Sequence, residues 1–264
     1  MVAFFATIAF PCSAQNDTLE TGKVITNAKM IGLGATEILD TYLSPEKYTG
    51  TELRYISHTT RERQGRKWSR QIVHIGDVAN VKSRSKDGNE IAGMYNFEYA
   101  WHYNWHFFGG QLDVKAGAMV DFNLGFIYNT RNGNNPGQAR AFLNFTPSAV
   151  VTYHFAIKEK PFALRYEIGV PLCGVMFSPN YGQSYYEIFS RGNYDHNIVP
   201  TYFGNAPSLR NMLTLDFRLL KTTFRLGYMG DFQQSRVNDL KTHVYTHAVV
   251  IGVVKHFKIL NIRP

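Results

Sequence analysis

The sequence predicts an all-β protein, a single antiparallel up-and-down β-barrel that spans a membrane with about ten strands, twelve being the alternative count. Three observations predict this fold. Long segments alternate apolar and polar residues with a period of two. Aromatic residues are frequent, with 16 Tyr, 19 Phe and 3 Trp in 264 residues. The chain also lacks any run of 18 apolar residues, which a spanning helix would need.

The segment Ile91–Phe107 shows the alternation most clearly. One face carries Ile91, Tyr95, Phe97, Tyr99, Trp101, Tyr103, Trp105 and Phe107, and the other carries Asn96, Glu98, His102, Asn104 and His106. Strands of soluble sandwiches are usually about 5–6 residues long. The length and the aromatic density are typical of a strand that crosses a bilayer between aromatic girdles.

Nine further segments complete the predicted set. The three segments that precede Ile91–Phe107 alternate less cleanly. In the segments that follow it, apolar residues such as Val114, Leu143 and Leu164 alternate with polar or charged residues. In chain order the ten segments are Met30–Asp40, Thr51–Thr60, Trp68–Ser83, Ile91–Phe107, Leu112–Phe126, Ala139–Phe155, Phe162–Met176, Leu209–Leu219, Thr222–Phe232 and His243–Phe257.

The connections between these segments fall into two classes. Tight joints are expected at Phe108–Gln111, Lys158–Lys160 and Lys221, and longer loops at Tyr42–Gly50, Ser85–Glu90, Thr130–Gln138, Ser178–Ala206 and Gln233–Lys241. With both termini in the periplasm, the tight joints lie on the periplasmic side and the loops outside, as barrels arrange them. The fairly long joint Arg61–Lys67 conflicts with this arrangement.

Two prolines also conflict with continuous strands. Pro147 and Pro171 fall inside predicted strands, and a closed barrel has no free edge to accommodate them. Each therefore requires a bulge or a local break.

The chain divides into a leader and one domain. Residues 1–14 are expected to be a signal peptide, although its start lacks a basic residue, and residues 15–264 to form the barrel. Cys12 lies in this leader, so Cys173 would be the one cysteine of the mature chain, without a disulfide partner.

The formal net charge of +8 favours contact with outer-membrane lipid and lipopolysaccharide. No nucleic-acid-binding motif accompanies it.

Charged residues gather on the face predicted to line the lumen. They can form a selectivity lining for a pore or an ion-pair network that fills a narrow barrel. Barrels of about eight strands hold side chains alone, whereas aqueous channels need about sixteen, so the filled barrel is favoured. The set is Glu98, Asp113, Lys115, Asp121, Arg140, Arg165, Glu167, Arg210, Asp216, Arg218, Arg225 and Asp231.

The longest loop, Ser178–Ala206, is rich in Tyr and Asn and is expected to act as a lid or a binding surface. It also holds the catalytic candidates, an acid–base pair formed by Asp195 and His196 with Ser184 or Ser190 as nucleophile. Asp, His and Ser residues in loops more often form turns or face solvent, so enzymatic activity is the less favoured hypothesis. We expect neither a metal nor another cofactor, since His102 and His106 lie about 13 Å apart on one strand.

Three stretches resemble a known family: Ile31–Arg54, Ala92–Trp105 and Met176–Asn197. They are similar to an uncharacterised family of outer-membrane β-barrel proteins of Bacteroidota, with a domain of unknown function, and the resemblance covers most of the mature chain. It implies a barrel in the cell outer membrane. It supplies no catalytic residue.

The leading functional hypothesis is a non-catalytic outer-membrane barrel with a filled lumen, acting as an accessory subunit of other outer-membrane proteins or as a surface-interaction protein. Two alternatives stay open. One is a hydrolase that acts on lipid or peptide at the rim, and the other is a narrow channel for small solutes.

Overall fold

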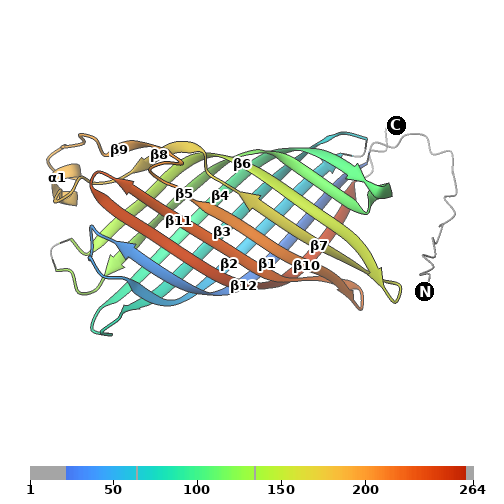
Figure 1. The fold of residues 1–264 in the computed structure, drawn as a ribbon, viewed down its shortest axis with the longest axis horizontal. Helices are drawn as coiled ribbons and strands as arrows, with labels where there is room; N and C mark the ends of the chain where they lie inside the picture. The colour runs from blue at the N-terminus through green and yellow to red at the C-terminus, as the bar shows by residue number, and fades with distance from the viewer. Residues whose placement is uncertain (1–21, 64, 134, 260–264) are drawn as a thin grey trace, which may run out of the picture.

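The computed structural model describes residues 22–63, 65–133 and 135–259, and it is a barrel of long tilted strands (Figure 1). The predicted signal peptide lies outside these residues. The elements are β1 Lys23–Asp40, β2 Tyr48–Arg63, β3 Trp68–Ser83, β4 Asn89–Phe107, η1 Phe108–Gly110, β5 Leu112–Asn129, β6 Gly137–Ile157, β7 Lys160–Gly169, β8 Cys173–Phe177, α1 Tyr185–Phe189, β9 Ile198–Tyr202, β10 Leu209–Leu219, β11 Thr222–Val237 and β12 Leu240–Ile259.

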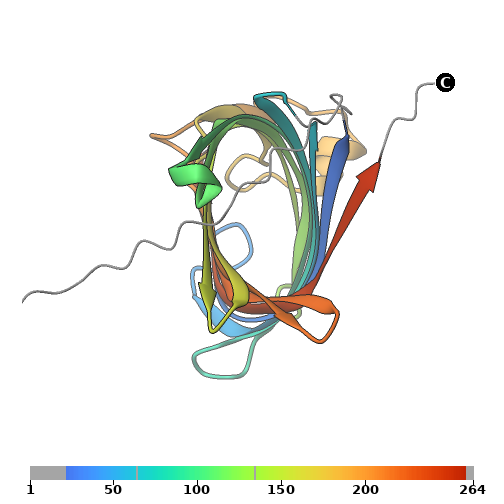
Figure 2. The same cartoon turned by 90° about the vertical axis from the view of Figure 1, so that its right-hand side faces the viewer.

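Ten of the strands close into a ring of antiparallel neighbours, in the order β1-β2-β3-β4-β5-β6-β7-β10-β11-β12. The ring closes because β1 pairs with β12 from Lys23–Ile259 to Asp40–Thr242, and Figure 2 shows it along the barrel axis. The predicted ten-stranded antiparallel barrel is confirmed. The two remaining strands, β8 and β9, form a hairpin attached to β6.

The two ends of the barrel differ. The end that carries α1 and the longer connections is called the loop end, and the opposite end, where β1 starts and β12 stops, the terminal end (Figure 1). The joint after β2 is short because β2 continues to Arg63 and β3 starts at Trp68, which removes the conflict at this joint. The predicted loop Gln233–Lys241 is wrong: it is mostly strand, closed by Asn238 and Asp239, whose φ angles of 50° and 59° suit a tight hairpin turn.

The two prolines lie at one interruption of the ladder. β6 pairs with β7 through Ser148–Gly169 and with β8 through Phe145–Cys173, so the second strand carries one extra residue around Pro171. The Val170 N–H donates to the Pro147 carbonyl (3.1 Å), which shows that the Pro147 backbone faces this bulge. The donor that proline lacks is therefore on the bulged side, and the pairing of β6 with β5 is not interrupted.

The outward face of the barrel is apolar and exposed. Trp101 and Trp105 lie there with exposed fractions of 46% and 41%, on the same face as the exposed Phe122 and Leu124 of β5. A closed ring leaves no unpaired edge, and such a belt is stable in hydrocarbon rather than in water. The chain is therefore a β-barrel protein of the outer membrane.

Neither η1 nor α1, the helices of the described residues, could span a bilayer.

Candidate functional site

The inward residues of β2 show how the lumen is layered. From the loop end to the terminal end they include Tyr48, Glu52, Arg54, Ile56, His58 and Glu62, and of these six the first five are buried. Because every second residue of a strand faces the same side, this order sets an aromatic layer, an ion-pair layer, an apolar layer and a second polar layer along the axis.

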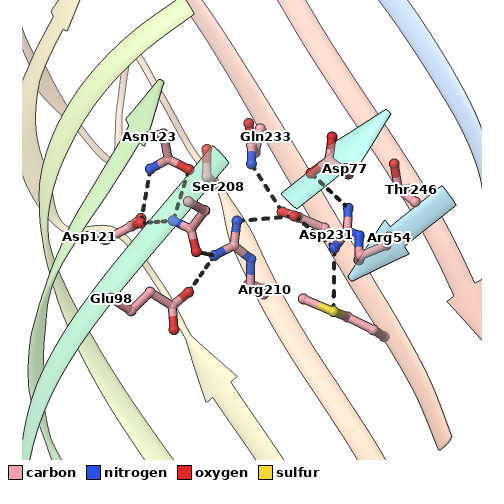
Figure 3. A network of polar contacts seen from close by, with 12 residues as sticks. Arg54, Asp77, Glu98, Asp121, Asn123, Ser208, Arg210, Asp231, Gln233 and Thr246 are labelled. Carbon is pink, nitrogen blue, oxygen red and sulfur yellow. Dashed lines mark hydrogen bonds and ion pairs between the residues drawn. The ribbon is translucent and has the colours of Figure 1, made fainter. Parts of the chain in front are cut away.

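The ion-pair layer crosses the lumen (Figure 3). Arg54 on β2 contacts Asp231 on β11 (Nη1 to Oδ2, 3.1 Å) and Glu52 (Nε to Oε1, 2.7 Å). Arg210 on β10 donates to the same Asp231 oxygen (3.0 Å) and also pairs with Glu98 on β4. Since β4 and β10 lie on nearly opposite sides of the ring, the chain of contacts bridges the barrel from wall to wall.

Side-chain amides complete this layer. The Asn96 amide donates to Asp121, and so do the amides of Asn123 (2.9 Å) and Asn144 (3.4 Å). The Asn96 carbonyl oxygen accepts from Arg210 (2.8 Å). A buried carboxylate is costly unless it is paired or hydrogen-bonded, and Asp121 meets this condition through amides.

An apolar layer lies directly below. A small cavity of about 30 Å³ lies beside it, which is room for about two water molecules. The layer consists of Ala28, Met30, Ile56, Val73, Ile75, Met212, Met229, Val250 and Val254.

The second polar layer and a wide vestibule occupy the terminal half. Arg165 pairs with Glu167 (2.6 Å), which also contacts His58 (3.4 Å), and Arg225 holds both oxygens of Asp216 (2.6 and 2.7 Å). Beyond them the lumen widens to a cavity of about 400 Å³. Its walls carry the Lys115–Glu62 pair and the contacts of Asp113 with His106 and His154.

The predicted lumen residues separate by depth. Glu98, Asp121, Arg140, Arg210 and Asp231 lie in the loop half, Arg165, Glu167, Asp216 and Arg225 in the second layer, and Asp113, Lys115 and Arg218 in the vestibule. Sequence reasoning missed Glu52, Arg54, Asp77 and His58. The alternation of Glu52, Arg54 and His58 within Thr51–Thr60 was the available signal.

The loop from Ser178 to Ala206 is folded back on itself. Asn197 donates to Ser178 (3.1 Å) and to Gln183 (2.7 Å), and Gln183 donates to the Asn193 carbonyl (3.0 Å). Asn238 of the β11–β12 turn donates to the His196 carbonyl (2.9 Å) and ties the loop to the barrel. The segment is thus ordered by its own side chains.

Helix α1 is capped and anchored. Ser184 accepts from the Glu187 N–H, and Glu187 accepts from the Ser184 N–H (2.7 Å) and hydroxyl (2.9 Å), which lowers the pKa of Glu187. Tyr42 donates to the Gln183 carbonyl (3.0 Å), and burial raises the pKa of this phenol to about 12. Tyr185 donates to Gln138 (2.8 Å) on β6. The helix is therefore held against the barrel mouth.

The catalytic candidates do not form a triad in the described residues. Asp195 and His196 contact each other (2.7 Å), but both side chains are more than three-quarters exposed. The Ser184 hydroxyl is engaged by Glu187, and Ser190 is the C-cap of α1. No hydrogen bond among the described side chains joins a serine to His196. Within the same residues, no group of three or more His, Cys, Asp or Glu is placed to hold a metal ion.

Comparisons with known proteins give a family and distant structural likenesses. A family model described as "Protein of unknown function (DUF3316)" matches residues 1–264. No curated protein matches the chain. The transport unit of the autotransporter AIDA-I from Escherichia coli aligns with 7% identity and a TM-score of 0.42, over 92% of this chain and 93% of that one. The outer membrane protease OmpT from Escherichia coli aligns with 5% identity and a TM-score of 0.43, over 93% and 99%.

Proposed function

Because this chain belongs to the DUF3316 family, proteins of unknown function, we propose a role from its own geometry. The protein is a non-conducting outer-membrane barrel whose loop end faces the cell exterior and binds another protein. It acts as a surface-interaction protein or an accessory subunit. Outer-membrane lipid and lipopolysaccharide surround it, as its net charge of +8 favours.

The layered lumen is the observation that supports a barrel that does not conduct solutes. Contacts from Arg54 through Asp231 and Arg210 to Glu98 bridge the ring, and the apolar layer lies below them. A solute would have to break buried ion pairs and then pass the apolar side chains below them. Both steps are costly, which disfavours the narrow channel.

The observation that carries the binding part is the aromatic surface of the loop. Tyr181, Tyr186, Phe189 and Tyr194 are each between 61% and 75% exposed although the segment around them is ordered. Rigid aromatic side chains with little rotamer entropy are the usual anchors of protein interfaces. The exposed Asp195–His196 pair gives a hydrolase less support, because no serine contacts His196 among the described residues.

Site-specific photo-cross-linking on intact cells tests the binding role. A photoreactive residue in place of Tyr186 is expected to give one discrete protein adduct, and Phe189→Ser in the same chain is expected to weaken it. The control places the same residue at Lys86, which is exposed in the β3–β4 turn at the same end. Identical adducts at both positions, or none at Tyr186, would contradict the proposal.

A further inference from the structure

The barrel wall has a break in its loop half, next to the two prolines. There β7 ends at Gly169 and β10 starts at Leu209, and the β8–β9 hairpin covers the interval. β8 pairs with β6 through Ala141–Phe177 to Phe145–Cys173, whereas the second edge of β9 pairs with no strand among the described residues. The wall between β9 and β11 is therefore not closed by a ladder.

The free edge of β9 is protected from pairing. Pro200 has no N–H to donate, and its carbonyl accepts from the side chain of Asn205 (3.1 Å). The Tyr202 N–H donates to the same Asn205 side chain (2.8 Å). β11 is satisfied in turn, since the Arg236 N–H donates to the Asn205 carbonyl (2.7 Å). Asn205 therefore satisfies backbone groups on the facing edges of β9 and β11, and the two strands do not pair with each other.

A cavity of about 70 Å³ lies at this break. Its lining includes five consecutive residues of β11, Asp231–Ser235, and three of β6, Gln138–Arg140. Because successive side chains of a strand face opposite sides, a cavity that touches all of them lies at the strand edge and reaches both faces of the wall. The cavity thus lies along the edges of β6 and β11, next to the break.

Four residues that line this cavity each carry a buried polar atom that has no hydrogen-bond partner among the described residues. These atoms are Asp40 Oδ2, Thr146 Oγ1, Thr201 Oγ1 and Arg210 Nε. Thr146 and Thr201 are more than nine-tenths buried. Buried polar groups are almost always paired, so four unpaired ones on the residues around one cavity favour a hydroxyl-bearing ligand that these side chains turn to meet. The set combines an acceptor, a donor and two hydroxyls that can do either.

The surroundings restrict the chemistry of this ligand. Three carboxylates (Asp40, Asp121 and Asp231) and two guanidiniums (Arg140 and Arg210) line the cavity, so neither a free anion nor a free cation is favoured. The volume holds about five water-sized groups, the size of a glyceryl head. The outward side chains around the break, Leu172, Tyr202 and Phe203, are apolar or aromatic and more than half exposed.

We infer that this break is a lipid-binding site, which takes the uncharged, hydroxyl-bearing head of a single-chain lipid, while the acyl chain leaves through the wall between β9 and β11. A monoacylglycerol has this chemistry. The site borders the loop that carries the proposed protein-binding surface, since Thr201 and Ala206 line it, but retained lipid and a protein adduct are separate measurements, so the two proposals can fail separately.

Native mass spectrometry of the full chain in phosphatidylcholine nanodiscs tests the inference, with 1-mono-oleoylglycerol and oleate as probes. The wild type is expected to retain one monoacylglycerol. Thr201→Phe fills the cavity and is expected to weaken retention by at least about tenfold. Thr201→Val removes one hydroxyl and is expected to weaken it by about threefold to tenfold, the effect of one hydrogen bond. Ala206→Trp, which fills the cavity from the loop, gives a second route if Thr201→Phe does not fold.

Matched controls are Thr51→Val and Thr51→Phe, at an exposed position of β2, which are expected to leave retention unchanged. A photoreactive monoacylglycerol is expected to cross-link to Leu209 and Phe232 rather than to Leu53 on the opposite wall. No retained lipid, retention unaffected by Thr201→Phe and Ala206→Trp, or preference for oleate by tenfold or more would overturn the inference.

Discussion

The two sides of the barrel wall are built differently. On the side made by β11, β12 and β1–β5, neighbouring strands pair without interruption, as in the ladder of β1 with β12 from Lys23–Ile259 to Asp40–Thr242. On the side made by β6–β10, β7 and β10 pair from Phe162–Phe217 to Gly169–Arg210, and a separate hairpin completes the wall. The same chain therefore contains a regular wall and a broken one.

The comparison shows how a barrel can satisfy its backbone where the strand ladder is broken. In hydrocarbon every backbone donor and acceptor needs a partner. The broken side meets this need by removing donors, with Pro147 and Pro200, and by satisfying the remaining groups with Asn205. The regular side, in contrast, anchors Glu52, Arg54 and Asp231 of the lumen network.

The largest expected effect is on the regular side. Arg54→Met removes the cation that contacts Glu52, Asp77 and Asp231 in a buried layer. Leaving Glu52 and Asp77 without this cation, and Asp231 with Arg210 alone, is expected to cost about 3–5 kcal/mol in the free energy of unfolding. Urea unfolding in lipid vesicles, followed by tryptophan fluorescence, measures it.

The control for this experiment is Arg218→Met, since Arg218 is exposed in the vestibule. Its effect is expected within about 0.5 kcal/mol. Equal destabilisation by the two variants would show that the buried network has no special role.

The next largest expected effect on stability comes from adding a proline to the regular side, compared with removing one from the broken side. Ser57→Pro introduces proline into β2, where Ser57 pairs with Lys29 and His74, and is expected to destabilise the barrel by about 2 kcal/mol or more. Pro147→Ala restores a donor that faces the bulge and is expected to change stability by less than about 1 kcal/mol. The same unfolding assay compares them. Similar costs at both positions would contradict the distinction between the two walls.

The smallest expected effect is at the loop end, outside the wall. The Ser184 N–H and then its hydroxyl lower the pKa of Glu187, so the helix cap stabilises α1 fully above about pH 4.5 and is lost as the pH falls through the lowered folded value. Glu187→Ala is expected to speed amide exchange in Tyr185–Phe189 roughly threefold at neutral pH. Hydrogen exchange followed by mass spectrometry measures it, and β1 serves as the internal reference. Exchange in α1 that is independent of pH and of this substitution would exclude the cap.

Much of the fold was predictable because the alternation in β4, β5 and β6 is long and clean. The prolines were also informative, since Pro147 and Pro171 required the bulge that the structure has. The loop half of β11 was not predictable, because Gln233, Gln234 and Arg236 are polar on both faces and resemble a loop. A period-two pattern indicates which side of the sheet a residue faces, but it does not identify the strand or residue with which it pairs.

The candidate sites were predictable to a smaller extent. Inward charges such as Arg210 and Glu98 follow from alternation, but their contact joins nearly opposite strands, which no local pattern encodes. The cavity at the break depends on where β7 stops and β9 replaces β10. That replacement is a tertiary property of residues far apart in the chain.

Single-channel recording of the purified wild-type protein in planar bilayers tests the filled lumen most directly. With the Arg54–Asp231–Arg210–Glu98 contacts and the apolar layer in place, no steady conductance is expected in the wild type. Folded Arg54→Met is also expected to stay closed, because the Arg210–Glu98 contact and the apolar layer remain. A stable, ion-selective conductance of the wild type would contradict the account and favour the channel instead.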